Sequence, residues 1–163
     1  LWKVENFREF LINRRTLISK AMNEFLDNYK ENEANFYDDQ NITQLVQLDE
    51  SETLEYKETW EYDIRQSMAR NEPSGSSQMQ LNCIKTVAAF LNSNGGNLFI
   101  GINDDKVVEG MERDLELVRN NSLDLLQNKI SQKFIDALGT EKKPYYSVEQ
   151  HEIDGQIIFR INY

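Results

Sequence analysis

The chain has 163 residues, of which 39% are hydrophobic and 28% are charged, and its formal net charge is −10. This length allows one domain with a hydrophobic core, or one such domain with a helical appendage. The acidic balance argues against a surface that coats nucleic acid through clustered basic residues, and the single cysteine, Cys83, excludes an internal disulfide and a cysteine-rich zinc site.

No apolar run approaches the roughly 20 residues of a membrane span, so we expect no membrane partner and a cytoplasmic location. The chain begins at Leu1 without a methionine and ends at Tyr163 within a strand-like run. We therefore expect it to be part of a longer protein, and we expect other domains of that same chain as partners. Whether the chain forms a homodimer is left open.

The first part of the chain has the pattern of a helical appendage. Apolar residues recur at helical spacing between about residues 4 and 29, which predicts one or two helices. Arg14 and Arg15 mark a candidate break between them. An appendage of this kind, together with the linker that follows it, is expected to occupy residues 1–46.

The linker is acidic. Twelve acidic residues between Asp27 and Asp63 face only Lys30 and Lys57, so this segment carries the whole net charge of the chain. A solvated linker explains its first half, and short helical or irregular structure is expected around residues 42–48. A solvated linker does not explain "ESETLEYKE", where four acids stand among apolar residues.

Alternating and helical patterns follow, and they predict a domain over residues 47–163. We expect a strand over residues 53–59, a loop at "NEPSGSSQ", and a helix over residues 77–92 that "NSNGG" terminates. The stretch "NLFIGINDDKVVEG" has the pattern of a β-hairpin turning at "NDDK".

A further helix is expected over residues 122–138, on the stripe of Leu123, Leu126, Ile130 and Phe134. The chain closes with two alternating strands around an Asp154-Gly155 turn. This order of elements predicts an α+β domain with a mixed or antiparallel sheet and two packed helices, preceded by the helical appendage.

The motifs resemble those of the Schlafen AlbA_2 family. The resemblance rests on "ESETLEYKE", on "TVAAFLNSNGGNLFIGINDD", on "VVEG" and on the late "HEIDGQIIFRI", and it covers roughly residues 47–163. It implies a nucleic-acid-associated module, often regarded as DNA-binding, that works within a larger protein. In animal Schlafen proteins the same motif supports a metal-dependent ribonuclease that acts on structured RNAs such as tRNA.

The resemblance also implies site residues. The family's two strand acids fall on Glu50 and Glu55, and the acid that closes its second strand motif falls on Asp104, so these three carboxylates would be metal ligands and catalytic groups. The basic residues that surround the acids in catalytic members are missing here.

Physical chemistry allows the same site. Two or three carboxylates suit Mg²⁺ or Mn²⁺, and these ions promote phosphodiester cleavage. Glu55 and Lys57 share one strand face, so Lys57 can contact a phosphate beside a metal on Glu55 and join the catalytic set. Glu50 has the opposite parity and joins only if the chain turns near Ser51. The alternative is structural: Glu55 and Lys57 form a surface ion pair, and Asp104 opens a turn.

A second candidate surface lies after the acidic strand. Arg65 and Arg70 can hold phosphates, and Lys57 can join them, while Trp60 and Tyr62 can stack on bases as in single-strand binders. Packing of the two aromatic residues into the core is the competing interpretation.

Three functions remain open. The first is a nucleic-acid-binding module, for DNA or RNA, within a larger protein. The second is a metal-dependent nuclease that uses Glu50, Glu55 and Asp104. The third is an assembly module that makes protein contacts through the N-terminal helices and the acidic linker.

Overall fold

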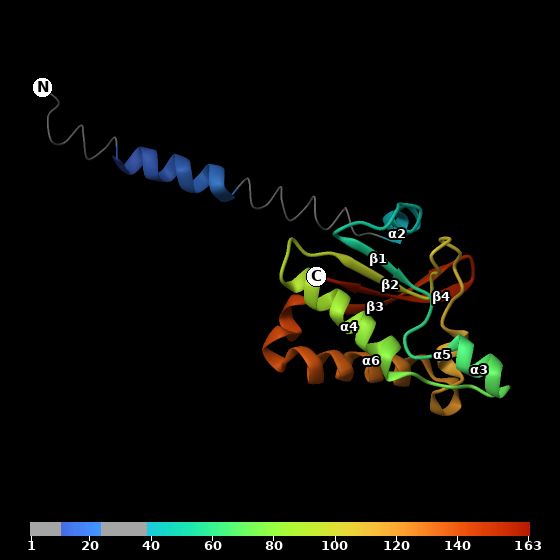
Figure 1. Cartoon of the computed structure of the whole chain (residues 1–163). Helices are drawn as coiled ribbons and strands as arrows, with labels where there is room; N and C mark the ends of the chain where they lie inside the picture. Colours follow the sequence, from blue (N-terminus) through green and yellow to red (C-terminus); the bar gives the residue numbers. More distant parts are fainter. Residues whose placement is uncertain (1–10, 24–38) are drawn as a thin grey trace, which may run out of the picture. The chain divides into compact units, whose positions relative to one another are not determined.

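A short sheet and the helices around it occupy most of the chain (Figure 1). The computed structural model describes residues 11–23 and 39–163, and the chain divides into two units, Leu1–Leu45 and Val46–Tyr163. Residues 11–23 are helical. The named elements are α2 (Asp39–Leu45), β1 (Leu54–Lys57), α3 (Ile64–Arg70), α4 (Ser77–Leu91), β2 (Asn97–Ile100), α5 (Glu112–Leu115), η1 (Arg119–Asn121), α6 (Leu123–Leu138), η2 (Thr140–Tyr145), β3 (Ser147–Ile153) and β4 (Gln156–Asn162).

The first unit contains the helix of residues 11–23 and α2. The helix runs without interruption through Arg14 and Arg15, so the predicted break at these two residues is wrong. The rest of the predicted appendage, and most of the acidic linker, lies outside the described residues. The helix leaves its large apolar side chains about half exposed or more, namely Leu11, Ile12, Leu17, Ile18 and Met22.

The second unit is built on a four-stranded mixed sheet in the order β1-β2-β4-β3. Strands β1 and β2 pair in parallel, whereas β2 with β4 and β3 with β4 pair antiparallel. The predicted α+β class, with a mixed sheet and a preceding helix, is confirmed. β1 and β3 are the two edges of the sheet.

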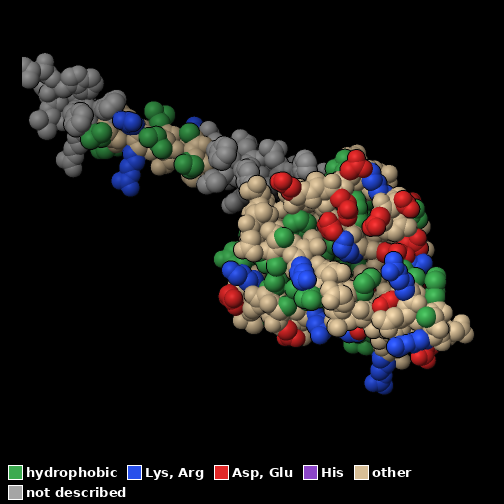
Figure 2. Space-filling model, viewed as in Figure 1, with side chains coloured by type: hydrophobic (Ala, Val, Ile, Leu, Met, Phe, Trp, Pro, Cys, Tyr) green, Lys and Arg blue, Asp and Glu red, His purple; other side chains and the backbone are tan. Residues whose placement is uncertain are grey.

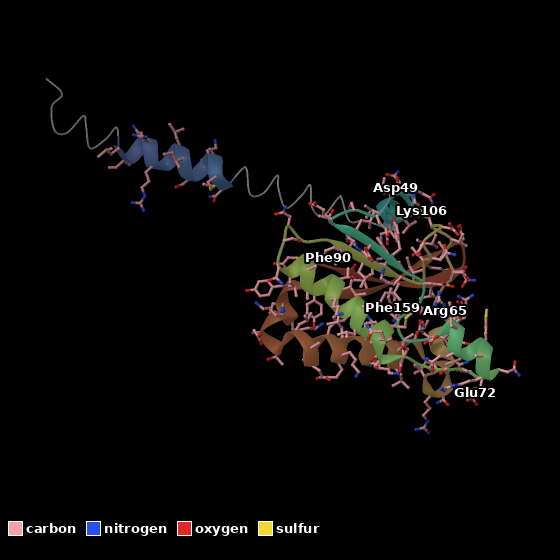
Figure 3. The ribbon with its side chains drawn as sticks, viewed as in Figure 1. Asp49, Arg65, Glu72, Phe90, Lys106 and Phe159 are labelled. Carbon is pink, nitrogen blue, oxygen red and sulfur yellow. The ribbon has the colours of Figure 1, made fainter. Side chains whose placement is uncertain are left out.

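Helices α4 and α6 cover one face of the sheet (Figure 1). Leu98 and Ile100 of β2 face them, as do Phe159 and Ile161, their register partners on β4. The core on this face also includes Trp60, Cys83, Val87, Phe90, Met111, Leu126, Ile130, Phe134 and Tyr146. Figure 3 shows Phe90 and Phe159 among these side chains. Both helices were predicted from their apolar stripes, and both are confirmed.

The "NSNGG" segment ends α4 as predicted. Gly95 adopts a φ of 85°, and its N–H donates to the carbonyl of Phe90 at 3.3 Å. A Cβ at Gly95 would lie 2.6 Å from the backbone oxygen of Tyr163, and a Cβ at Gly96 would lie 2.7 Å from the ring of Phe90. These two positions therefore need glycine, the first for its backbone angle and the second for the close approach of the chain to a buried ring.

The hairpin predicted for "NLFIGINDDKVVEG" is confirmed only at its turn. The "NDDK" turn brings Ile102 and Val108 into an isolated antiparallel bridge, but the described residues after the turn form no second strand of the hairpin, and β2 pairs with β1 and β4. Two short helices, α3 and α5, were not predicted. Local alternation identifies a strand but not its neighbours, because those neighbours come from distant parts of the chain.

The closing hairpin is confirmed. Asp154 and Gly155 have φ values of 52° and 79°, as a two-residue turn with both central residues left-handed requires. Among the described helices, none is long and apolar enough to cross a membrane.

Candidate functional site

The acidic stretch "ESETLEYKE" forms the open edge of the sheet. The carbonyls of Thr53 and Lys57 accept hydrogen bonds from Asn97 and Gly101, both at 2.8 Å, so the odd-numbered residues of β1 direct their backbone groups toward β2. The backbone groups of Leu54 and Tyr56 therefore point outward, away from the sheet. An edge of this kind invites pairing with another chain unless something covers it.

A tight turn covers the first half of this edge. The N–H of Ser51 donates to the carbonyl of Leu54 at 2.9 Å, and the N–H of Leu54 donates back to the carbonyl of Ser51 at 3.4 Å. The turn at Ser51 that the sequence required for Glu50 to approach the strand is therefore present.

Two charged side chains cover the second half. The carboxylate of Glu50 accepts from the N–H of Tyr56 at 2.9 Å, and Nζ of Lys57 donates to the carbonyl of Tyr56 at 2.8 Å. Lys57 also forms an ion pair with Glu55. Glu50 and Lys57 thus satisfy the backbone of an edge strand, which is a structural reason for the presence of these two residues.

Replacing Glu50 tests that role. Glu50→Ala removes the hydrogen bond from the Tyr56 N–H to the Glu50 carboxylate, and we expect the free energy of unfolding to fall by about 1 kcal/mol. Glu50→Gln keeps an acceptor oxygen and is expected to cost less than half as much. Urea denaturation of the two variants measures the difference. Equal losses would show that charge, and not edge hydrogen bonding, is what Glu50 supplies.

Glu55 and Lys57 lie on the helix-covered face, since they are in register with Leu98 and Ile100. Their side chains are 29% and 28% exposed, so solvent screens their ion pair. Lys57 also acts on Cys83: burial raises the pKa of this thiol to about 12, and the lysine charge opposes that rise. Glu55 and Lys57 are thus brought together on the helix-covered face of the sheet, near Cys83 of α4.

Asp104 lies in the exposed turn after β2. Asn103 organises this turn, because its side-chain oxygen accepts from the N–H groups of Asp105 and Val107, each at 3.0 Å. Lys106 of the same turn contacts Asp49, and the two side chains point toward one another in Figure 3. Within the described part of the chain, the carboxylate of Asp104 makes no hydrogen bond or ion pair.

Acidic and basic side chains are interspersed over β1 and the turn after β2 (Figure 2). Arg113 of α5 pairs there with Glu58 and Glu109. Among residues 11–23 and 39–163, no group of three or more histidine, cysteine, aspartate or glutamate side chains is placed to hold a metal ion. The metal-binding and catalytic roles of Glu50, Glu55 and Asp104 stay a prediction.

Helix α3 contains Arg65 and Arg70, which the sequence analysis predicts to hold phosphates. Asp63 caps its N-terminus by accepting from the N–H of Gln66 at 2.9 Å, and Asn71 ends it with a φ of 55°. Arg65 and Arg70 are exposed, and neither makes a hydrogen bond or an ion pair with the described residues. The helix was missed because it is short and polar, although its aspartate cap could be recognised.

A pocket of about 330 Å³ lies beside α3. It is lined by Tyr62, Ile64, Ser67, Met68, Asn71, Glu72, Pro73 and Arg113. Four of these residues belong to α3 and its C-cap and follow the spacing i, i+3, i+4 and i+7, namely Ile64, Ser67, Met68 and Asn71. They therefore form one helix face. Arg65 and Arg70 then lie on the two flanks of that face. Sequence reasoning named the arginines but not the pocket.

Asp114 holds the segment that contributes Tyr62. Its buried carboxylate accepts from the N–H groups of Trp60, Glu61 and Tyr62 at 2.8, 2.7 and 2.8 Å. Burial raises the pKa of Asp114, and the three hydrogen bonds act in the opposite direction. Nothing local in the sequence indicates this role, because its partners lie more than fifty residues away.

The two aromatic residues of the segment have different positions. Trp60 is fully buried, and its ring centroid lies 5.5 Å from that of Phe134, so it belongs to the core. Tyr62 is half-buried and lines the pocket. Of the two, only Tyr62 is placed to contact a ligand.

These features define an α+β module with a charged sheet edge and a helix-flanked pocket. The chain belongs to the Schlafen AlbA_2 family, whose model matches residues 50–163, and this confirms the family that the motifs indicate. No solved structure matches the chain.

Proposed function

We propose that the chain is a nucleic-acid-binding module that works within a larger protein. The observation that carries the proposal is the match to the Schlafen AlbA_2 family over residues 50–163. Arg65 and Arg70 support it, because they are exposed cations without an acidic partner in the described residues. Lys57 supports it less, since Glu55 and the carbonyl of Tyr56 already engage its ammonium group.

Binding is proposed over cleavage because two of the three predicted ligands already have partners. Glu50 accepts from a backbone N–H, Glu55 pairs with Lys57, and Asp104 extends from the turn that follows β2. A metal-dependent nuclease needs carboxylates that share one or two ions. In the described structure Glu50 serves the backbone of the edge strand and Glu55 serves the ion pair with Lys57.

Fluorescence anisotropy with labelled RNA and DNA oligonucleotides tests the proposal. We expect weak binding at low ionic strength that falls steeply as salt is raised, because a few cations on a chain with net charge −10 must hold the phosphates. A tenfold or larger loss of affinity between low and physiological salt is the expected result, with the full chain used throughout.

Two outcomes would overturn it. Absence of binding to both RNA and DNA at low ionic strength would favour assembly through the helix of residues 11–23, whose apolar side chains are exposed. Cleavage of the RNA that depends on Mn²⁺ and is lost in Glu55→Gln would replace binding by catalysis. Gel analysis of the same samples separates these outcomes.

A further inference from the structure

The pocket beside α3 combines apolar walls, polar groups at its rim and cations on its flanks. Resting on the proposed function, we propose that it receives one unpaired base of a single-stranded nucleic acid, while Arg65 and Arg70 contact the phosphates on either side of that base. Its volume of about 330 Å³ is at the small end of ligand pockets and suits one planar heterocycle with its sugar.

The walls of the pocket fit a flat, weakly polar ring. Tyr62 is the aromatic lining residue, and Ile64, Met68 and Pro73 are the apolar ones. Bases stack on aromatic side chains without regard to sequence, and a methionine thioether adapts to the face of a ring. Met68 is 79% exposed, an unusual exposure for a methionine that a stacked base would reduce.

The two sides of this face fit phosphates. Arg65 and Arg70 lie on opposite sides of the pocket-lining face of α3, so a strand whose base enters the pocket would pass both arginines. Arg113 is different, because Glu58 and Glu109 already neutralise its charge. It therefore acts as a wall of the pocket and not as a phosphate ligand.

The rim adds selectivity. Asn71 and Glu72 line the pocket, and neither side chain makes a hydrogen bond within the described residues. A carboxylate accepts from the exocyclic amino groups of adenine, cytosine and guanine, whereas uracil and thymine have none. We therefore expect Glu72 to favour amino-bearing bases over uracil and thymine. A duplex offers no unpaired base, so single strands should bind more tightly than duplexes.

Anisotropy titrations at low ionic strength with oligo(C), oligo(U) and a duplex of equal length test this site. Arg65→Ala combined with Arg70→Ala is expected to weaken binding to every single strand at least tenfold and to reduce the salt slope by about one per arginine. The matched control is Lys85→Ala combined with Lys133→Ala, which removes two exposed cations from α4 and α6 and should change affinity less than twofold.

Two pocket variants complete the test. Tyr62→Leu should weaken single-strand binding about tenfold through lost stacking and leave the salt slope unchanged. Glu72→Gln should narrow the preference for oligo(C) over oligo(U) by severalfold, chiefly by weakening oligo(C). Both side chains are partly or fully exposed, and circular dichroism checks that each variant is folded.

The outcomes distinguish the site from the function. If the unaltered chain binds no oligonucleotide, the proposed function fails and the pocket site fails with it. If the chain binds but the arginine and lysine pairs lose affinity equally, or the duplex binds as tightly as oligo(C), nucleic acid is bound elsewhere and only the pocket site is overturned.

Discussion

Asp114→Ala is expected to lower the free energy of unfolding by about 3 kcal/mol or more. The substitution leaves the N–H groups of Trp60, Glu61 and Tyr62 without their acceptor, and each unsatisfied buried donor costs about 1 to 3 kcal/mol. Asp114→Asn keeps one acceptor oxygen but turns an amide NH₂ toward a backbone N–H, so it should cost about 1 to 3 kcal/mol. Urea denaturation followed by tryptophan fluorescence measures both.

Asp105→Ala is the matched control. Asp105 is exposed, and its carboxylate makes no hydrogen bond or ion pair with the described residues. The free energy of unfolding should therefore change by no more than about 0.5 kcal/mol. A loss for Asp114→Ala no greater than that of the control would contradict the anchoring role.

Asp114 also connects stability to the candidate site, because the segment that it holds ends at a pocket-lining residue. Asp114 itself does not line the pocket. In Asp114→Asn, Tyr62 is therefore expected to become less well positioned, with weaker single-strand binding and an unchanged salt slope, as for Tyr62→Leu. A loss of stability without any loss of single-strand binding would show that Tyr62 does not need this anchor to contact the ligand.

The second large effect is expected for Phe134→Ala, which should lower the free energy of unfolding by about 3 to 5 kcal/mol. Phe134 is fully buried on α6, and its ring centroid lies 5.5 Å from that of Trp60 and 5.8 Å from that of Tyr146. Truncation removes both ring contacts and leaves a cavity between α6 and the segment after β1. The midpoint of urea denaturation should fall while the slope with denaturant is unchanged.

Leu125→Ala provides the control on the same helix. Leu125 is 45% exposed, so removing its side chain leaves no buried cavity and should cost less than about 1 kcal/mol. The prediction fails if the two truncations cost the same, since α6 would then pack through a different face from the one that contains Phe134.

Several elements could be predicted because their signals are local. Helices α4 and α6 repeat apolar residues every three or four positions, and a helix with such a stripe buries it wherever the rest of the chain lies. The Asp154-Gly155 turn depends only on two residues that tolerate positive φ. The family itself could be recognised from motifs that lie within residues 50–163.

The pairing of the strands could not be predicted, because paired strands lie far apart in the sequence. The turn at "NDDK" favours a hairpin, yet β2 pairs with β1, which lies about forty residues earlier, and with β4, which lies about sixty residues later. Alternation reports that a segment is a strand and which side chains share a face. It does not report the neighbour, because many strands of similar pattern satisfy the same hydrogen bonds.

The candidate site shows the same division. From the sequence alone, Glu55 and Lys57 could be placed on one strand face and Arg65 and Arg70 near one another, because short spacing determines these relations. Only the tertiary structure decided that Glu50 turns back onto Tyr56 and that Asp114 holds Tyr62 beside α3. Such relations depend on how distant segments pack, and packing is a property of the whole chain that no short stretch of residues specifies.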